Sequence, residues 1–205
     1  MKALYEQAME GTHHLYNGSE YVEYQPLDEE HPYFLTDEWI EGEIIYDGEK
    51  FSNIPMLFDI EKGKLIVPYP HKGIIIQMIN DHLNEFTLPG HRFINLKTTT
   101  DSLTMRKGFY EVLYQGKTPV LARRTKQFTE KIQETGISRS FEESNQYFLE
   151  TNGQFFRITG RRDLLRTLGG KRKELALFIR KNNLFTSNRE SSIIQIARYY
   201  DSLNL

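Results

Sequence analysis

Alternating apolar and polar residues dominate the middle of the chain and predict antiparallel strands. In the segment 51–60, the even positions from Ile54 to Ile60 are apolar, so one face of a strand there would be buried. Asp47-Gly48 precedes this segment, and both residue types tolerate the positive φ of a tight hairpin turn. Pro55 donates no backbone hydrogen bond, so this strand should lie at a sheet edge or carry a bulge.

The same pattern recurs as far as residue 158 and predicts a succession of hairpins. A second strong turn signal, Asn152-Gly153, separates Tyr147–Glu150 from Gln154–Ile158. Lys126–Ser144 is charged and poorly patterned, which leaves a long hairpin extension and a mobile loop as its two interpretations. Further strands are predicted at residues 43–46, 65–69, 74–79, 85–88, 92–96, 109–114 and 119–124.

The hydrophobic period changes near residue 160 to one that is typical of helices. Asp163–Leu168 predicts a short helix that Gly169-Gly170 ends. Lys171–Asn182 carries one apolar stripe, with basic residues around it, and predicts a second helix. Ser187 and Glu190 have the spacing of a capping box, in which the two residues satisfy each other's backbone N–H groups, and predict the start of a third.

These patterns predict an α+β fold that is mainly antiparallel β, either a meander sheet or an open barrel of hairpins, with a C-terminal helical segment. The β domain is expected over residues 1–160, including an irregular N-terminal segment, and the helical segment over residues 161–205, packed on that domain. Aromatic residues make up 13% of the 205 residues, and Tyr and Phe favour strands. This composition also argues against disorder.

Several chemistries are excluded or left without a signal. The chain has no cysteine, which excludes disulfides, thiolate catalysis and cysteine-ligated metal sites. No apolar run approaches the roughly 18 residues that span a bilayer, and no signal peptide is visible at the start. The phosphate-binding and dinucleotide-binding glycine motifs and the nucleophile elbow do not occur. The sequence therefore predicts no cofactor, and it favours a non-enzymatic role while leaving an enzyme open.

Two weak candidates for metal binding and catalysis remain. The adjacent His13 and His14 could join an acidic loop in a metal site, but a solvated surface is the simpler interpretation; the loop residues are Asp28, Glu29, Glu30 and His31. Carboxylates near Trp39 are similar to a glycosidase pair, but alternate acids also form the solvent face of a half-buried strand; they are Asp37, Glu38, Glu41 and Glu43. We assign no catalytic or metal-binding residue.

The charges are divided between the two halves of the chain. Residues 1–90 carry 17 Asp or Glu and 5 Lys, whereas residues 91–205 carry 11 acids and 21 bases. The halves could pack together and neutralise each other, or they could form an acidic and a basic face that orient the protein towards an anionic partner. The candidate partner surface consists of Arg123, Arg124, Arg157, Arg161, Arg162, Lys171, Arg172 and Lys173.

This basic surface has two further potential partners. Basic residues next to Phe155 and Phe156 could bind nucleic acid or anionic lipid headgroups. A pI near 6.3 disfavours nucleic acid, because a dedicated nucleic-acid-binding domain is usually strongly basic.

Several stretches spread over most of the chain carry a resemblance to a known family. They are Leu15-Tyr16-Asn17-Gly18 with Glu20-Tyr21, His31-Pro32-Tyr33-Phe34-Leu35 with Trp39, Tyr46-Asp47-Gly48 through Ile54-Pro55-Met56-Leu57-Phe58-Asp59, Gly108-Phe109-Tyr110 with Leu121-Ala122-Arg123-Arg124, and Lys173-Glu174-Leu175 to Phe178-Ile179-Arg180-Lys181-Asn182. Together they resemble an uncharacterised family of Bacteroidota cell-envelope proteins. The resemblance implies an exported protein, periplasmic or associated with the outer membrane, whose signal sequence is missing from this chain. It transfers no catalytic residue.

Three functions compete on these grounds. The first is a non-enzymatic cell-envelope binding module, or an accessory subunit of an outer-membrane assembly, with an envelope protein as its partner. The second is a periplasmic carrier of lipid or lipoprotein, with an apolar cavity enclosed by a curved sheet. The third, more remote, is an envelope hydrolase, which needs convergent polar groups in a pocket.

Overall fold

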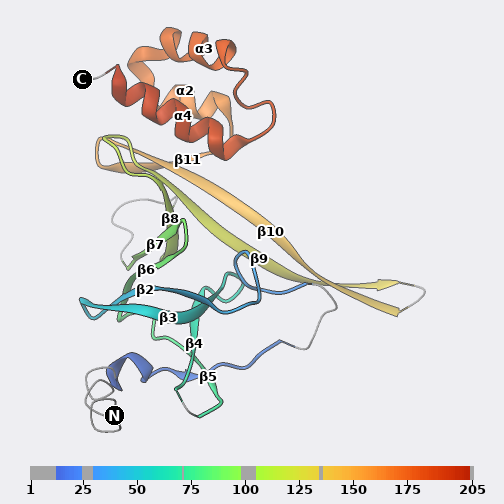
Figure 1. Cartoon of the computed structure of the whole chain (residues 1–205). Coiled ribbons are helices and arrows are strands. Elements are labelled where there is room, and N and C mark those ends of the chain that lie inside the picture. Colours follow the sequence, from blue (N-terminus) through green and yellow to red (C-terminus); the bar gives the residue numbers. More distant parts are fainter. Residues whose placement is uncertain (1–12, 25–29, 71, 98–104, 134–135, 204–205) are drawn as a thin grey trace. The chain divides into compact units, whose positions relative to one another are not determined.

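The computed structural model describes residues 13–24, 30–70, 72–97, 105–133 and 136–203. Strands account for 46% of these residues and helices for 22%, so the predicted fold class is confirmed: antiparallel β with a C-terminal helical segment (Figure 1). The chain divides into two compact units. Unit 1 is Met1–Asn95 with Thr125–Ser144, and unit 2 is Leu96–Arg124 with Asn145–Leu205. This division differs from the expected boundary at residue 160.

Unit 1 contains a sheet whose strand order is β1-β5-β4-β3-β2-β6-β7, with every neighbouring pair antiparallel. A 3₁₀ turn, η1 (His13–Tyr16), precedes it. The strands are β1 (Ser19–Glu20), β2 (Ile40–Tyr46), β3 (Glu49–Asp59), β4 (Lys64–Pro68), β5 (Ile75–Gln77), β6 (Leu83–Leu88) and β7 (His91–Leu96).

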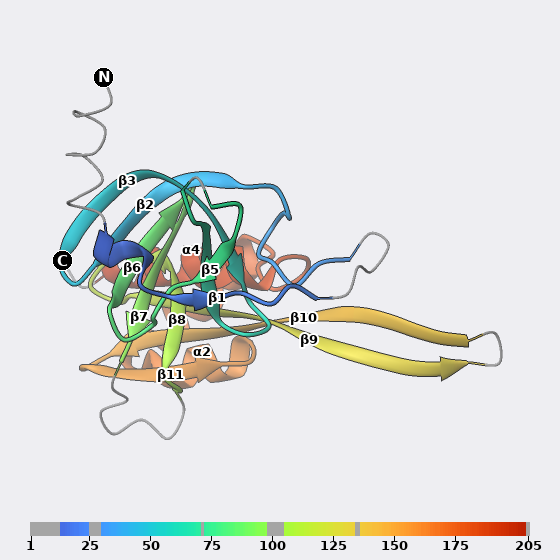
Figure 2. The ribbon, with the colours of Figure 1, turned by 90° about the horizontal axis from the view of Figure 1, so that it is seen from below.

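The hairpin β2–β3 forms where the turn signal predicted it. Asp47 and Gly48 have φ values of 51° and 83°, which is the backbone conformation that a tight hairpin turn requires. β3 pairs with β2 as far as Met56 and with β4 only from Leu57, so Pro55 has no β4 residue opposite it. A register shift in β2 between Gly42 and Ile44 accompanies this, and Figure 2 shows β2 and β3 as a curved pair.

Interlocked aromatic rings fill the core of unit 1. Phe86 and Phe93 stack with their ring centroids 4.8 Å apart, and Phe58 contacts both edge-on. Phe34 lies 5.1 Å from Phe93. All four side chains are buried. Ring pairs at these separations add to the free energy of burial, so this cluster is a main stabilising element of unit 1.

Unit 2 combines a small antiparallel sheet with the helices. Its strands are β8 (Gly108–Tyr114), β11 (Gln154–Ile158), and the parts of β9 (Val120–Gln133) and β10 (Gly136–Thr151) that fall in residues 120–124 and 145–151. The Asn152-Gly153 turn joins β10 and β11 with φ values of 53° and 75°, as predicted. β9 and β10 continue through residues 125–133 and 136–144, which are grouped with unit 1, so the charged segment is a long hairpin extension.

The helices are α2 (Arg161–Thr167), η2 (Gly169–Lys171), α3 (Arg172–Lys181) and α4 (Arg189–Ser202). They gather beside β11 (Figure 1), and their apolar side chains share one core with the sheet of unit 2. Leu164, Leu175, Ile193 and Ala197 are among its fully buried members, together with Val120 of β9. The amphipathic stripes seen in the sequence therefore pack against a sheet face, as a surface helix requires.

The start of α4 corrects one detail of the sequence prediction. Its N-cap is Asn188, whose side chain accepts a hydrogen bond from the Ser191 backbone N–H at 2.9 Å, and not Ser187. Both residue types are good caps, and here the Asn188 side chain makes the capping hydrogen bond. It places Glu190 in the first turn of α4, where its carboxylate contacts Arg124.

Candidate partner-binding surface

A buried ion network fixes α4 to the sheet of unit 2. The Arg124 guanidinium on β9 contacts Glu111 of β8 at 2.6 Å and Glu190 of α4 at 2.7 Å. The side chains of Arg124 and Glu111 are only 8% and 4% exposed. Burial by itself would lower the pKa of Arg124, but the carboxylates of Glu190 and Glu111 outweigh it and raise the pKa. The guanidinium therefore stays charged and holds three elements together.

A second polar contact holds the other end of α4. Asp201 accepts hydrogen bonds from the Tyr114 hydroxyl at 2.9 Å and from the Thr118 backbone N–H at 3.2 Å. The guanidinium of Arg198 lies 5.6 Å from the centre of the Tyr114 ring. The first and last turns of α4 are thus both attached to the sheet through carboxylates. Two of the acids of the helical segment are used inside unit 2.

Most bases of the helical segment are exposed to solvent. The Asp163 carboxylate has partners close in the sequence, since it accepts hydrogen bonds from Thr159 and Arg166. In contrast, a set of exposed bases forms no ion pair with any described residue, and we call it the basic surface: Arg157, Arg161, Arg162, Arg172, Lys173, Arg180 and Lys181. Unit 2 carries 17 Lys or Arg and 7 Asp or Glu, a net charge of +10. Because bases outnumber acids and Glu111 is buried, the exposed charge of unit 2 is strongly positive.

The structure sorts the eight bases that the sequence singled out. Five of them lie on the basic surface, and Lys171 is half-buried at its margin in η2. Arg123 is also half-buried, with its guanidinium 6.0 Å from the centre of the Tyr110 ring. Arg124 is buried and neutralised by Glu111 and Glu190, so its charge belongs to the interior of unit 2.

An apolar groove lies between α3 and α4, with Lys181 of the basic surface in its lining, and the sequence prediction missed it. The groove has a volume of about 460 Å³ and is lined by Glu174, Leu177, Phe178, Lys181, Asn182 and Tyr199. Leu177 is 64% exposed. The rings of Phe178 and Tyr199 stack 4.0 Å apart and form its floor. The signal in the sequence was Leu177 itself, an apolar residue off the stripe that packs on the sheet.

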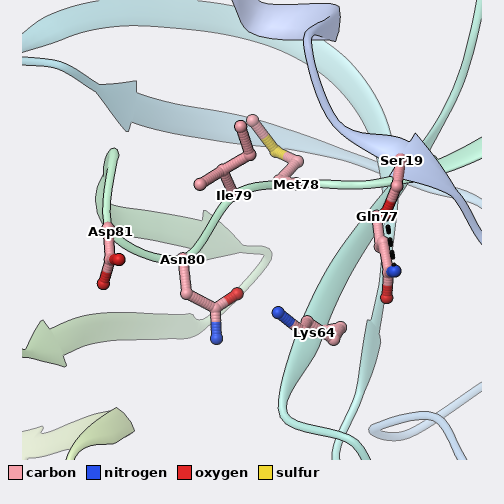
Figure 3. Close-up of a pocket in the computed structure, with 7 residues that line it drawn as sticks. All are labelled: Ser19, Lys64, Gln77, Met78, Ile79, Asn80 and Asp81. Carbon is pink, nitrogen blue, oxygen red and sulfur yellow. Dashed lines mark hydrogen bonds between the residues drawn. The ribbon is translucent and has the colours of Figure 1, made fainter.

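A smaller cavity in unit 1 is polar (Figure 3). It has a volume of about 290 Å³ and is lined by Ser19, Lys64, Gln77, Met78, Ile79, Asn80 and Asp81. Gln77 donates to the Ser19 hydroxyl at 2.8 Å, and Asn80 donates to the Gly63 carbonyl at 3.0 Å. Its lining differs from the apolar cavity that a lipid carrier would need.

A buried carboxylate in unit 1 stabilises a turn. Asp59 is fully buried and accepts hydrogen bonds from the Tyr21 hydroxyl and from the backbone N–H groups of Glu61 and Lys62, at 2.8 to 2.9 Å. Burial raises the pKa of Asp59 above its usual value, although these donors oppose the shift. Lys126 donates to the carbonyl groups of two residues of the segment that precedes β2, at 2.8 and 2.9 Å. These contacts hold loops in place.

The residues that the sequence suggested for a metal site do not come together in the structure. His14 lies 3.2 Å from Glu49, whereas His31 stacks on Tyr33. Asp28 and Glu29 lie outside the described residues, as does the side chain of His13. The described residues contain no group of three or more His, Asp or Glu that could hold a metal ion.

The acids around Trp39 lie on an exposed face. Asp37, Glu38 and Glu41 are exposed, as is Trp39 itself. The Glu43 carboxylate contacts the Lys50 ammonium at 2.8 Å. The arrangement is that of a solvated strand face.

Comparison of the chain with protein-family models, curated proteins and solved structures gave no match. Within the described ranges, no helix combines the length and the apolar character that crossing a membrane requires.

Proposed function

We propose that this chain is a non-enzymatic binding module that engages an acidic protein partner through its basic surface. One observation carries the proposal: in unit 2 Glu111, Glu190 and Asp201 are held in internal contacts, while the seven exposed bases of the basic surface form no ion pair with a described residue. Like charges that crowd on one surface repel each other, and an anionic partner relieves that repulsion. Such a surface also speeds association by attracting the partner over a distance.

The apolar groove supports a protein partner over nucleic acid or a lipid surface. Protein interfaces combine an apolar centre with a charged rim, and Leu177 lies among the bases in that way. Bases of nucleic acids stack on free aromatic faces, and Phe178 and Tyr199 each have one ring face covered by the other. The anchors that hold both ends of α4 keep the surface rigid, which lowers the entropic cost of binding.

The resemblance to Bacteroidota envelope proteins supplies the cellular setting of this proposal. On that basis the module would act in the periplasm or at the outer membrane, as an accessory subunit of an outer-membrane assembly. The partner would then be an envelope protein with an acidic surface.

Charge reversal on the full chain tests this function. The double variant R172E/K173E should lose a partner that the wild type recovers from native envelope extract, because it reverses two charges of the basic surface. The matched control K50E/K72E makes the same change in net charge within unit 1 and should keep that partner. Recovery should fall between roughly 0.05 M and 0.5 M salt, as screening weakens charge attraction.

Three outcomes contradict the proposal. The first is recovery of the same partner by the wild type and by R172E/K173E. The second is recovery of no stable partner at low salt. The third is that the wild type binds duplex DNA, RNA or anionic lipid vesicles more tightly than any envelope protein, with R172E/K173E losing that binding.

A further inference from the structure

We infer that the groove between α3 and α4 is a docking site for an acidic amphipathic helix of the partner. The inference rests on the proposed function and specifies which part of the partner is bound. The groove is formed by two packed helices, whose neighbouring rows of side chains leave a channel that a third helix can follow. Its volume of about 460 Å³ falls in the range of pockets that enclose several apolar groups.

Because the floor of the groove is apolar, the groove should bind the apolar face of the partner's helix. Leu177 is 64% exposed and borders the stacked pair Phe178 and Tyr199. Burying such surface is favourable by roughly 25 cal/mol per Å². An amphipathic helix presents apolar residues three, four and seven positions apart, so two or three of them could enter the groove together.

The charges around Leu177 determine which residues flank those apolar positions. On an α-helix, residues three or four positions apart are surface neighbours. For Leu177 they are Lys173, Glu174, Arg180 and Lys181, three bases and one acid. Glu174 and Lys181 line the groove and Lys173 and Arg180 lie beside it on α3, so a docked helix with Asp or Glu beside its apolar face would meet a net positive charge. A helix with Lys or Arg there would be repelled.

This charge distribution also argues against other occupants. The same groove on a second copy of the chain would bring together two basic surfaces, each from a unit with a net charge of +10. A helix that lies on a lipid bilayer buries a whole apolar face, whereas this groove lies between two helices and has Glu174 and Lys181 in its lining. A discrete helix with acidic flanks fits both the shape and the charge.

Two synthetic helical peptides test the inference on the full chain. Both carry the same leucines at positions 1, 4 and 8, with Glu flanks in one and Lys flanks in the other. Fluorescence anisotropy should show binding of the Glu peptide and at least about tenfold weaker binding of the Lys peptide. L177D should weaken binding of the Glu peptide by about tenfold or more, because it puts a charge in the apolar centre.

Two variants control for folding and for nonspecific charge effects. V22D places the same charge on another exposed apolar residue, Val22, which is 76% exposed in unit 1, and it should leave binding unchanged. L177M keeps an apolar side chain of similar size and should bind within about twofold of the wild type. Because Leu177 is exposed, L177D should keep the wild-type circular dichroism spectrum and unfolding midpoint.

The result that overturns the inference is equal binding of the two peptides, or binding of the Glu peptide that L177D leaves unchanged. Capture of the native partner separates this failure from that of the proposed function. If R172E/K173E loses the partner while L177D keeps it, the basic surface is the binding site and the groove is not. If both variants keep it, the proposed function fails too.

Discussion

The two units each bury a charged side chain, but they satisfy it in different ways. In unit 1, Asp59 receives hydrogen bonds from a tyrosine hydroxyl and two backbone N–H groups, all of them neutral. In unit 2, Arg124 is held between the carboxylates of Glu111 and Glu190. Burial raises the pKa of Asp59 towards its neutral form, whereas the two carboxylates keep Arg124 charged.

This difference adds to the opposite net charges that the two units have from their amino-acid composition. Unit 2 uses carboxylates to neutralise its interior, so its remaining surface is basic. Unit 1 carries 21 Asp or Glu and 9 Lys or Arg, and its buried Asp59 is satisfied by neutral donors. Many of its acids therefore stay in solvent, Glu23, Glu38 and Glu41 among them. The same physical need, satisfying a buried charge, contributes to surfaces of opposite sign.

Breaking the ion network of unit 2 should have the largest effect. R124M removes the guanidinium between Glu111 and Glu190 and leaves the Glu111 carboxylate buried without it. We expect a loss of about 3–5 kcal/mol in the free energy of unfolding, measured by urea denaturation. The neighbouring R123M should cost less than about 1 kcal/mol, since Arg123 is half-buried beside a ring.

The double variant E111M/R124M sharpens this prediction. Replacing both partners with apolar residues removes the buried charges together, so part of the stability lost in R124M should return. If R124M is as stable as the wild type, or if the double variant is less stable than R124M, the network does not anchor α4 in the way described.

The second anchor of α4 should contribute less. D201A removes the acceptor of the Tyr114 hydroxyl and the Thr118 N–H, and we expect a loss of about 1–3 kcal/mol. E174A, which removes an exposed acid of α3, should change the free energy of unfolding by less than about 0.5 kcal/mol. Equal midpoints in urea for D201A and the wild type would show that the last turn of α4 is not anchored through this carboxylate.

The smallest effect concerns the pH dependence of unit 1. Because the pKa of Asp59 is raised by burial, the folded protein binds this proton more readily than the unfolded chain does. The unfolding free energy of the wild type should therefore fall relative to that of D59N as the pH rises from about 4, the usual Asp value, through the raised pKa. Urea titrations of both proteins at a series of pH values measure this difference.

Asp163 supplies the opposite control. Hydrogen bonds from Thr159 lower the pKa of Asp163, so its contribution to stability is present above the usual Asp value and is lost as the pH falls through the lowered pKa. The unfolding free energy of the wild type should therefore rise relative to that of D163N as the pH rises through the lowered pKa. If the unfolding free energies of the wild type and D59N change in parallel with pH, Asp59 has the same pKa in the folded and unfolded states.

Several elements could be predicted because their causes are local. The turns at Asp47-Gly48 and Asn152-Gly153 depend on residues that accept positive φ, and the alternation around them is read directly from neighbouring positions. Gly169, with a φ of 54°, ends α2 where the sequence indicated. The start of α4 was misplaced by one residue, because the spacing to Glu190 favoured Ser187, whereas the neighbouring Asn188 is an equally good cap and makes the capping hydrogen bond.

The sequence by itself determined the antiparallel hairpins, the helical end and the separation of acidic from basic residues, since these depend on composition and short-range period. Only the tertiary structure decided that Arg124 is buried while Arg157 is exposed, and that Leu177 lies in a groove. Neighbouring strand residues point to opposite faces, and the face that the helices cover depends on residues far away in the chain. Which charges are neutralised, and so which surface is free to bind, is therefore a property of the fold.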